Sequence, residues 1–222
     1  MEEHTLDGLH YLIRYPSGYV RGQRYPVLFF FHGAGTRGTD IGKLKSNPFF
    51  IHVEQVQPFP FVVIAPHCTE NTWFDLFEKL QALIRTVAAS DFCDKTRIYA
   101  IGASMGGYAT WQLGMSMPDL LAAIVPICGG GMYWNAGRLK NTPVWAFHGE
   151  KDPVVLVEET KKMVAAVQKA GGNVKMTLYP EAAHDAWTET YQNGEVFRWL
   201  LSHQKGGTSN EKDAFSDTKA YG

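Results

Sequence analysis

One turn in the middle of the sequence constrains the fold more than any other feature. The letters GASMG at residues 102–106 follow an apolar run at 97–101 and precede a helical pattern that Pro118 ends. A serine in so tight a strand-to-helix turn is pushed toward strained backbone angles, so its neighbours two positions away must lack a Cβ atom. The turn exposes the Ser104 hydroxyl at the carboxyl end of a sheet, where open α/β sheets place ligands. Ser104 is therefore the predicted nucleophile.

The competing interpretation of this turn is a glycine-rich loop of a nucleotide-binding fold, which needs no acid or base further along the chain. Both groups are present downstream. Asp152 follows a strand expected at 144–148, where a loop carboxylate can orient an imidazole and stabilise its protonated form. His184 follows a strand expected at 174–179 and can act as the general base. Serine, acid and histidine thus occur in the chain order known for triads built on this kind of turn.

The predicted acid and base each have an alternative. Glu150 lies two residues before Asp152, which is favoured because Pro153 makes the loop directly after it rigid. A structural alternative for Asp152 is the N-cap of a helix expected at 157–170. A single loop histidine such as His184 is usually solvated or structural, and its place after the nucleophile and the acid is what favours catalysis.

A second glycine-containing segment, HGAGT, follows the first long apolar run. In this position a backbone N–H can complement the N–H of the residue after the nucleophile and bind an oxyanion. We assign these two donors to Ala34 and Met105. His32 and His148 each precede a glycine at a strand end, and we expect both to be buried and hydrogen-bonded in the core.

Short apolar runs alternate with helical patterns along the chain. Continuous apolar runs are typical of strands that are buried on both faces, and apolar residues three or four positions apart indicate helices. The alternation predicts an α/β fold with a mostly parallel sheet and helices on both faces. The expected strands lie at 9–14, 27–31, 61–65, 97–101, 122–127, 144–148 and 174–179, and the expected helices at 73–88, from the serine turn to about 117, at 157–170 and at 195–202.

The 222 residues suit one domain at 1–203, followed by a polar tail at 204–222 that we expect to be disordered. A formal net charge of -1 gives no electrostatic support for binding nucleic acid or an anionic membrane. Three cysteines without CxxC spacing predict neither a disulfide framework nor a metal site. The polar start lacks a signal-peptide core and no apolar stretch could span a bilayer, so the cytoplasm is the expected location. Whether a leader was removed ahead of Met1 is left open.

These segments together resemble the esterase/phospholipase group of the α/β-hydrolases, in particular the small bacterial phospholipase/carboxylesterase-like or "predicted peptidase" set. The matching stretches include FFFHGAGTRG, RIYAIGASMGGYATW, TPVWAFHGEKDPVV and EAAHDAWTETY, and they extend over residues 25–201. The resemblance implies an α/β-hydrolase fold without a large lid and a serine hydrolase that needs no metal or cofactor. It also implies Ser104, Asp152 and His184 as the triad. It does not fix the substrate, because relatives include carboxylesterases, feruloyl and acetylxylan esterases and proteins labelled as peptidases.

Three tryptophans are candidates for the walls of a substrate pocket, namely Trp73, Trp134 and Trp187. Core packing is an equal alternative for the first two and is favoured for Trp187, which precedes a helical pattern. Aromatic walls would suit a planar acyl group. The segment at 128–143 is too short for a large lid, so we expect an open site without interfacial activation.

The predicted activity is hydrolysis of small or medium carboxylic esters through an acyl-enzyme, feruloyl and acetyl esters of plant polysaccharide among them. One alternative is a serine peptidase of the prolyl-oligopeptidase type, for which 222 residues leave no room for a gating domain. Another is a non-catalytic ligand-binding member of the fold, which would generally have lost a triad residue. A small-molecule ester is the expected partner, and the oligomeric state is left open.

Overall fold

The computed structural model describes residues 1–206, in which eight strands form one sheet. Residues 207–222, most of the expected tail at 204–222, lie outside the described part. The strand order is β1-β2-β4-β3-β5-β6-β7-β8, with β2 antiparallel to both its neighbours and every other pair parallel. The strands are β1 (Glu2–Leu6), β2 (Leu9–Arg14), β3 (Tyr25–Phe31), β4 (Val62–Pro66), β5 (Cys93–Ala103), β6 (Ala123–Ile127), β7 (Val144–Gly149) and β8 (Val174–Tyr179).

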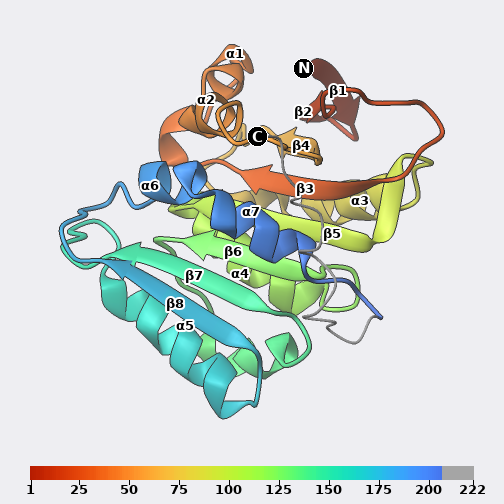
Figure 1. The fold of residues 1–222 in the computed structure, drawn as a ribbon. Helices are drawn as coiled ribbons and strands as arrows, with labels where there is room; N and C mark the ends of the chain where they lie inside the picture. Colours follow the sequence, from red (N-terminus) through yellow and green to blue (C-terminus); the bar gives the residue numbers. More distant parts are fainter. Residues whose placement is uncertain (207–222) are drawn as a thin grey trace, which may run out of the picture.

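Strand β3 shows why helices must cover both faces of the sheet. Side chains alternate between the two faces of a strand, yet all those from Val27 to Phe31 are buried. Phe29 and Phe31 join one core cluster with α3, α4 and α5, whereas Leu28 and Phe30 join another with α2, α6 and α7. Figure 1 shows α4 and α5 behind the sheet and α6 and α7 in front of it. The helices are α1 (Gly42–Lys45), α2 (Pro48–Val53), α3 (Phe77–Ala88), α4 (Met105–Ser116), α5 (Val157–Lys169), α6 (Trp187–Gln192) and α7 (Gly194–Leu201).

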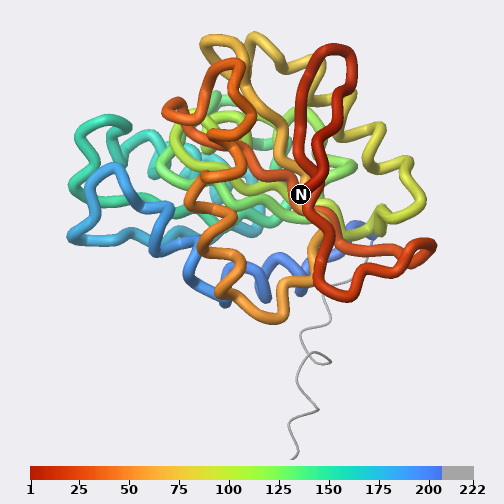
Figure 2. The backbone as a smooth tube through the Cα atoms, turned by 90° about the horizontal axis from the view of Figure 1, so that it is seen from above, coloured from red at the N-terminus to blue at the C-terminus, as the bar shows by residue number. Residues whose placement is uncertain are grey.

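The sheet places four loops at one edge of the molecule. The hairpin β1–β2 lies at one end of the fold and the strands β7 and β8 at the other (Figure 2). Between them, β3, β5, β6, β7 and β8 run parallel, so their carboxyl ends lie on the same side. The serine turn after β5 and the loops after β3, β7 and β8 therefore meet there, as expected for ligand sites of open α/β sheets.

The expected α/β class is confirmed, and each expected strand and helix is present with ends shifted by a few residues. Four elements were not expected. Strand β1 reads EEHTL and forms the edge of the sheet with mostly exposed side chains, so it carries no apolar run. Helices α1, α2 and α6 have four to six residues, too few to show a helical period in the sequence. No helix within residues 1–206 is long and apolar enough to cross a membrane.

Candidate active site

The candidate nucleophile sits on a strained turn between β5 and α4. Ser104 has φ 55° and ψ -119°, which is a conformation that non-glycine residues rarely adopt. A Cβ atom on Gly102 would lie 2.5 Å from the Gly106 carbonyl oxygen, and one on Gly106 would lie 1.9 Å from the Phe31 carbonyl oxygen. The two glycines of the motif are thus required by backbone contacts, and together they allow the sharp turn that presents the Ser104 hydroxyl.

Replacing Gly106 with alanine is expected to lower the free energy of unfolding by about 3 kcal/mol or more, because the new methyl group would collide with rigid backbone. Gly137→Ala is the matched control, since its Cβ would meet only the Ala170 methyl at 3.9 Å. Chemical denaturation of both variants checks the prediction. Equal stability of Gly106→Ala and Gly137→Ala would contradict this account of the turn.

The three residues predicted as a triad are brought together by three different loops. His184 Nε2 lies 2.9 Å from Ser104 Oγ, and His184 Nδ1 lies 2.7 Å from Asp152 Oδ2. Both lengths are ordinary hydrogen-bond distances. With its hydrogen on Nδ1, the His184 ring donates to Asp152 and leaves Nε2 free to accept the Ser104 proton. This is the order of contacts that a serine–histidine–acid relay needs.

The loop that carries His184 is held in place from two sides. Asp185 Oδ1 accepts a hydrogen bond of 3.0 Å from the Thr188 N–H at the start of α6. On the other side, β7 ends at Gly149, where a Cβ atom would lie 2.1 Å from the Ala183 carbonyl oxygen. The absence of a side chain at Gly149 therefore lets the histidine loop lie directly against the end of the strand that leads to Asp152.

The Asp152 carboxylate is fully buried and stays ionised through its hydrogen bonds. Oδ1 accepts from the Val154 and Val155 N–H groups at 2.8 Å and 3.0 Å, and Oδ2 accepts from His184. Burial acts to raise the pKa of Asp152, but these hydrogen bonds outweigh it and leave the pKa below its ordinary value. The group therefore offers His184 a full negative charge at neutral pH.

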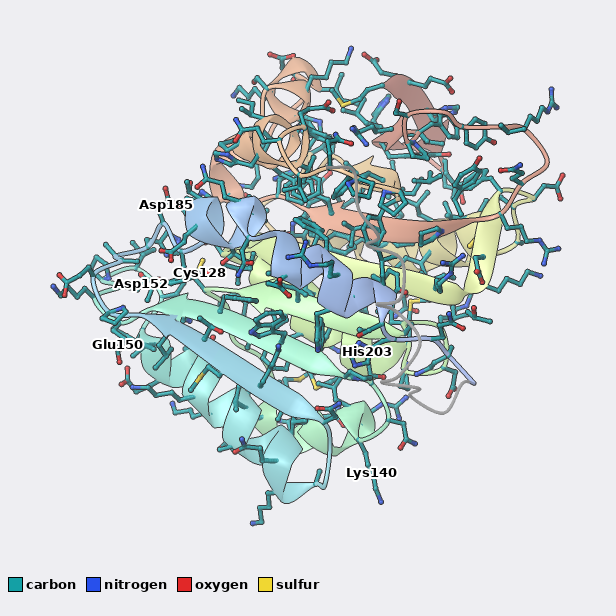
Figure 3. All side chains as sticks on the ribbon, in the orientation of Figure 1. Cys128, Lys140, Glu150, Asp152, Asp185 and His203 are labelled. Atoms are coloured by element: carbon teal, nitrogen blue, oxygen red, sulfur yellow. The ribbon has the colours of Figure 1, made fainter. Side chains whose placement is uncertain are left out.

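The structure also separates the two candidate acids. Glu150 is exposed, whereas Asp152 contacts His184, and Figure 3 shows both at the end of β7. Asp152 does not cap α5, whose N-cap residue is Leu156. Its Oδ1 instead closes the turn that leads to Val155, so the carboxylate orients the histidine and shapes its own loop at once.

The two expected oxyanion donors lie at the ends of neighbouring loops. Met105 is the first residue of α4 and Ala34 the first of a 3-10 turn, positions whose N–H groups have no partner inside their own helix. Neither N–H donates a hydrogen bond within residues 1–206. A Cβ atom on Gly33 would lie 3.7 Å from Ser104 Cβ, which places this loop directly beside the serine. The arrangement can bind a negative oxygen next to Ser104.

His32, which precedes this loop, is buried and hydrogen-bonded as expected. Its Nδ1 donates to the Gly33 carbonyl at 2.7 Å and its Nε2 accepts from the Cys68 N–H at 3.0 Å. Burial lowers the pKa of His32 to about 4, so the ring is neutral at physiological pH. The indole N–H of Trp73 donates to the His32 carbonyl at 3.0 Å. His32 and Trp73 thus support the oxyanion loop from within the core.

A cavity of about 440 Å³ opens onto Ser104 and His184. Its size is within the range of small-molecule sites. The two catalytic candidates and the Ala34 loop form one wall, and most of the other lining groups are apolar or aromatic. The remaining lining residues are Phe30, Asn47, Pro48, Ala103, Val154, Trp187 and Tyr191.

Of the three tryptophans proposed for the pocket, only Trp187 lines this cavity. Its ring meets the His184 ring edge-on at a centroid distance of 5.2 Å. Trp73 does not reach the cavity, because it is fully buried beneath the oxyanion loop. Trp134 also lies elsewhere, on the 3-10 helix between β6 and β7, where it is 73% exposed. This 3-10 helix is the main element of the segment, so no large lid is built there.

Sequence reasoning missed several groups that line the cavity. Asn47 caps α2 and donates to Thr36 Oγ1 at 3.0 Å, which attaches α2 to the oxyanion loop. Tyr191 is 2% exposed, and burial raises its pKa well above the ordinary value, so the phenol stays protonated. In the sequence WTETY, Trp187 and Tyr191 are four residues apart, which is about one helical turn. This spacing could have predicted that both side chains lie on the same face of a helix. Nothing in the sequence indicates Asn47.

Cys128 lies close to the acid and base but does not favour a metal. Its Sγ and donor atoms of Asp152 and His184 all lie within 4.8 Å of one another. Burial strongly raises the pKa of the Cys128 thiol. Because a cysteine binds metal as the thiolate, and because His184 and Asp152 already bond to each other, the chemistry of this donor set fits hydrogen bonding better than metal binding.

Known proteins match this chain in sequence. Among curated proteins, the chain is 22% identical over 158 residues to "Probable feruloyl esterase C" of Aspergillus terreus (strain NIH 2624 / FGSC A1156), covering 69% of this chain and 58% of that protein. It is 28% identical over 109 residues to "Acyl-protein thioesterase 1" of Gibberella zeae, covering 46% of each. The chain therefore spans about half the length of these curated relatives.

Solved structures extend the comparison to the fold. The structure described as "Crystal Structure of a Thermostable Esterase" has a TM-score of 0.78 and 33% sequence identity, covering 88% of this chain and 59% of that chain. The parallel sheet, its helices on both faces and these neighbours identify an α/β-hydrolase fold. Residues 64–217, which are more than half of the sequence, match the Dienelactone hydrolase family. The chain therefore belongs to the dienelactone hydrolase family.

Proposed function

We propose that this protein hydrolyses carboxylic esters with Ser104 as the nucleophile. The observation that carries the proposal is the chain of contacts from Ser104 Oγ through His184 to Asp152, with lengths of 2.9 Å and 2.7 Å, at the mouth of an apolar cavity. The esterase and thioesterase names of the relatives support the same class of reaction. No group outside the chain is needed for the steps that follow.

The proposed mechanism gives each residue one role. His184 Nε2 takes the proton of Ser104 Oγ as that oxygen attacks the ester carbonyl carbon. The carbonyl oxygen becomes an oxyanion, which the N–H groups of Ala34 and Met105 stabilise by roughly 3–4 kcal/mol each. His184 then gives the proton to the leaving alcohol, and an acyl group remains on Ser104. Asp152 stabilises the protonated ring throughout.

Water completes the reaction by the same steps in reverse order. His184 removes a proton from a water molecule that attacks the acyl carbon, and the carboxylic acid leaves as Ser104 regains its hydrogen. His184 must be neutral at the start of both halves, whereas Asp152 must be ionised. The pKa of Asp152 lies below its ordinary value because of its hydrogen bonds to His184, Val155 and Val154, so the carboxylate meets this requirement at neutral pH.

The cavity favours esters of small or medium acids with an apolar or planar acyl group. Phe30, Trp187 and Tyr191 give it aromatic walls, and about 440 Å³ can hold a group of the size of a hydroxycinnamate. Feruloyl and acetyl esters of plant polysaccharide are therefore within the proposed range. The feruloyl esterase names of relatives in Aspergillus point the same way.

A panel of substrates tests the reaction class and the acyl preference together. We expect turnover of p-nitrophenyl acetate and of methyl ferulate, and no measurable turnover of a peptide p-nitroanilide, because an amine leaves less readily than an alcohol. A fluorophosphonate should label Ser104, as peptide mass spectrometry can establish. Cleavage of the anilide as fast as the esters would favour a peptidase, and a lack of both turnover and labelling would favour a non-catalytic binding protein.

A further inference from the structure

A second histidine contacts the proposed catalytic acid. His148 lies near the end of β7 and is fully buried. Its Nε2 is 3.3 Å from Asp152 Oδ2 and 2.8 Å from the Val155 carbonyl oxygen. Both neighbours can only accept, so Nε2 carries a hydrogen, which bonds to the Val155 oxygen while Asp152 Oδ2 lies within ion-pair distance of the same nitrogen. Asp152 Oδ2 thus lies between the ring nitrogens of two histidines.

The other nitrogen of the His148 ring is fixed as well. Nδ1 lies 2.7 Å from the Thr160 hydroxyl oxygen, which in turn lies 2.7 Å from the Gly129 carbonyl oxygen. Thr160 belongs to α5 and is fully buried, and Gly129 follows β6. The ring is therefore held by groups from three separate parts of the fold, and its Nε2 has little freedom to move relative to Asp152.

The Asp152 carboxylate is surrounded by four N–H groups. The Val154 and Val155 N–H groups serve Oδ1, and the rings of His184 and His148 serve Oδ2. Burial lowers the pKa of His148, against the opposing effects of the Val155 carbonyl and the Asp152 carboxylate. Asp152 and His184 are the charged or titratable groups that act on the His148 ring. His148 approaches the carboxylate from the core and belongs neither to its loop nor to the proposed triad.

We propose that His148 is a positioning residue that fixes the Asp152 carboxylate for His184. The inference rests on the proposed serine mechanism, in which Oδ2 must point at His184 Nδ1. The Val154 and Val155 N–H groups hold Oδ1 in place. The contact from His148 then fixes the rotation of the carboxylate, and with it the position of Oδ2.

Two substitutions at this position test the proposal. In His148→Leu the side chain keeps its bulk but loses both nitrogens, and we expect kcat for p-nitrophenyl acetate to fall about tenfold, the effect of losing one hydrogen bond to a charged group. KM should stay within about twofold, because His148 does not line the cavity. In His148→Gln the side-chain amide can place an N–H where Nε2 lies, and kcat should recover most of the loss.

The pH profile supplies a readout that a purely structural role would not change. Without His148, the carboxylate is free to rotate away from His184 and stabilises the protonated ring less. The acid limb of the kcat profile should therefore move to lower pH in His148→Leu and return toward wild type in His148→Gln. The proton NMR chemical shift of the hydrogen on His184 Nδ1, measured without substrate, should likewise change in His148→Leu and return toward the wild-type value in His148→Gln.

His203→Leu is the control for the loss of a histidine from the packed interior. His203 is half-buried against Trp199, with ring centroids 4.5 Å apart, and Figure 3 shows it well away from Asp152. This variant should keep the wild-type profile. Thermal unfolding of all three variants establishes that the compared proteins are folded.

Two results would overturn the inference. One is a folded His148→Leu enzyme with unchanged kcat and acid limb. The other is an equal loss of kcat in both His148 variants with no shift in the pH profile or the NMR signal, which would mark His148 as structural. Failure of the proposed function is distinct from both, because wild-type protein would then neither turn over the ester nor react with the fluorophosphonate.

Discussion

Ser104→Ala is expected to reduce kcat for p-nitrophenyl acetate by about 10⁶-fold, the effect typical of removing the nucleophile of a serine hydrolase. The oxyanion donors and the cavity remain, so binding of the ester should change little. Initial rates measured with enzyme at high concentration, together with the loss of fluorophosphonate labelling, check the prediction. Ser116→Ala removes a hydroxyl from the far end of the same helix, where it accepts a hydrogen bond from Gln112, and should keep wild-type turnover.

The strained backbone at Ser104 gives this prediction a second measurement. A Cβ atom at φ 55° and ψ -119° costs about 1–3 kcal/mol, and alanine retains it. Glycine has no Cβ atom and relieves that strain. Its greater loss of backbone entropy on folding costs about 1 kcal/mol or less, which offsets part of the gain. Ser104→Gly should therefore be as inactive as Ser104→Ala yet unfold at a higher Tm. Normal turnover in either variant would contradict the assignment of Ser104 as the nucleophile. A lower Tm for Ser104→Gly than for Ser104→Ala would contradict the proposed backbone strain at this position.

Asp152→Asn is expected to lower kcat by about 10⁴-fold while leaving the fold intact. The amide oxygen of asparagine will stay at the Oδ1 position, because the Val154 and Val155 N–H groups need an acceptor. Its NH₂ group then faces His184 Nδ1, and two donors cannot bond. His184 must move its hydrogen from Nδ1 to Nε2, where it can no longer accept the proton of Ser104. Comparison of kcat and KM with wild type checks this directly.

Glu150→Gln is the matched control for the change in charge. Glu150 lies two residues before Asp152 and is exposed, and the same carboxylate-to-amide substitution there should leave kcat and the pH profile unchanged. If Glu150→Gln were as damaging as Asp152→Asn, the effect would come from the net charge near the site. If Asp152→Asn kept full activity, the role of Asp152 in orienting His184 would be wrong.

Local sequence patterns were enough to predict those strands and turns whose conformation shows in their own residues. The runs that became β3, β4 and β7 are almost entirely apolar, with the buried His148 of β7 as an exception, since both faces of each strand are buried. Such runs are visible in any window of the sequence. The serine turn is also visible locally as a glycine-flanked serine, although the contact that requires Gly106 comes from Phe31 on the neighbouring strand β3. The edge strand β1, which pairs only with the next strand β2 and is mostly exposed, and the six-residue α6 had no comparable apolar pattern.

The sequence by itself determined the order of the parts: a serine on a glycine-flanked turn, then an acid and a histidine, each placed just after a strand. Parallel strands bring such loops to one edge of a sheet whatever the details, which is why this order predicts a site. Only the tertiary structure decided which residues touch. It placed Asp152 against His184, kept Trp73 in the core and Trp134 at the surface, and set His148 behind the acid. The physical reason is that contacts of a few ångströms depend on how separate loops pack, and side-chain type constrains that packing only weakly.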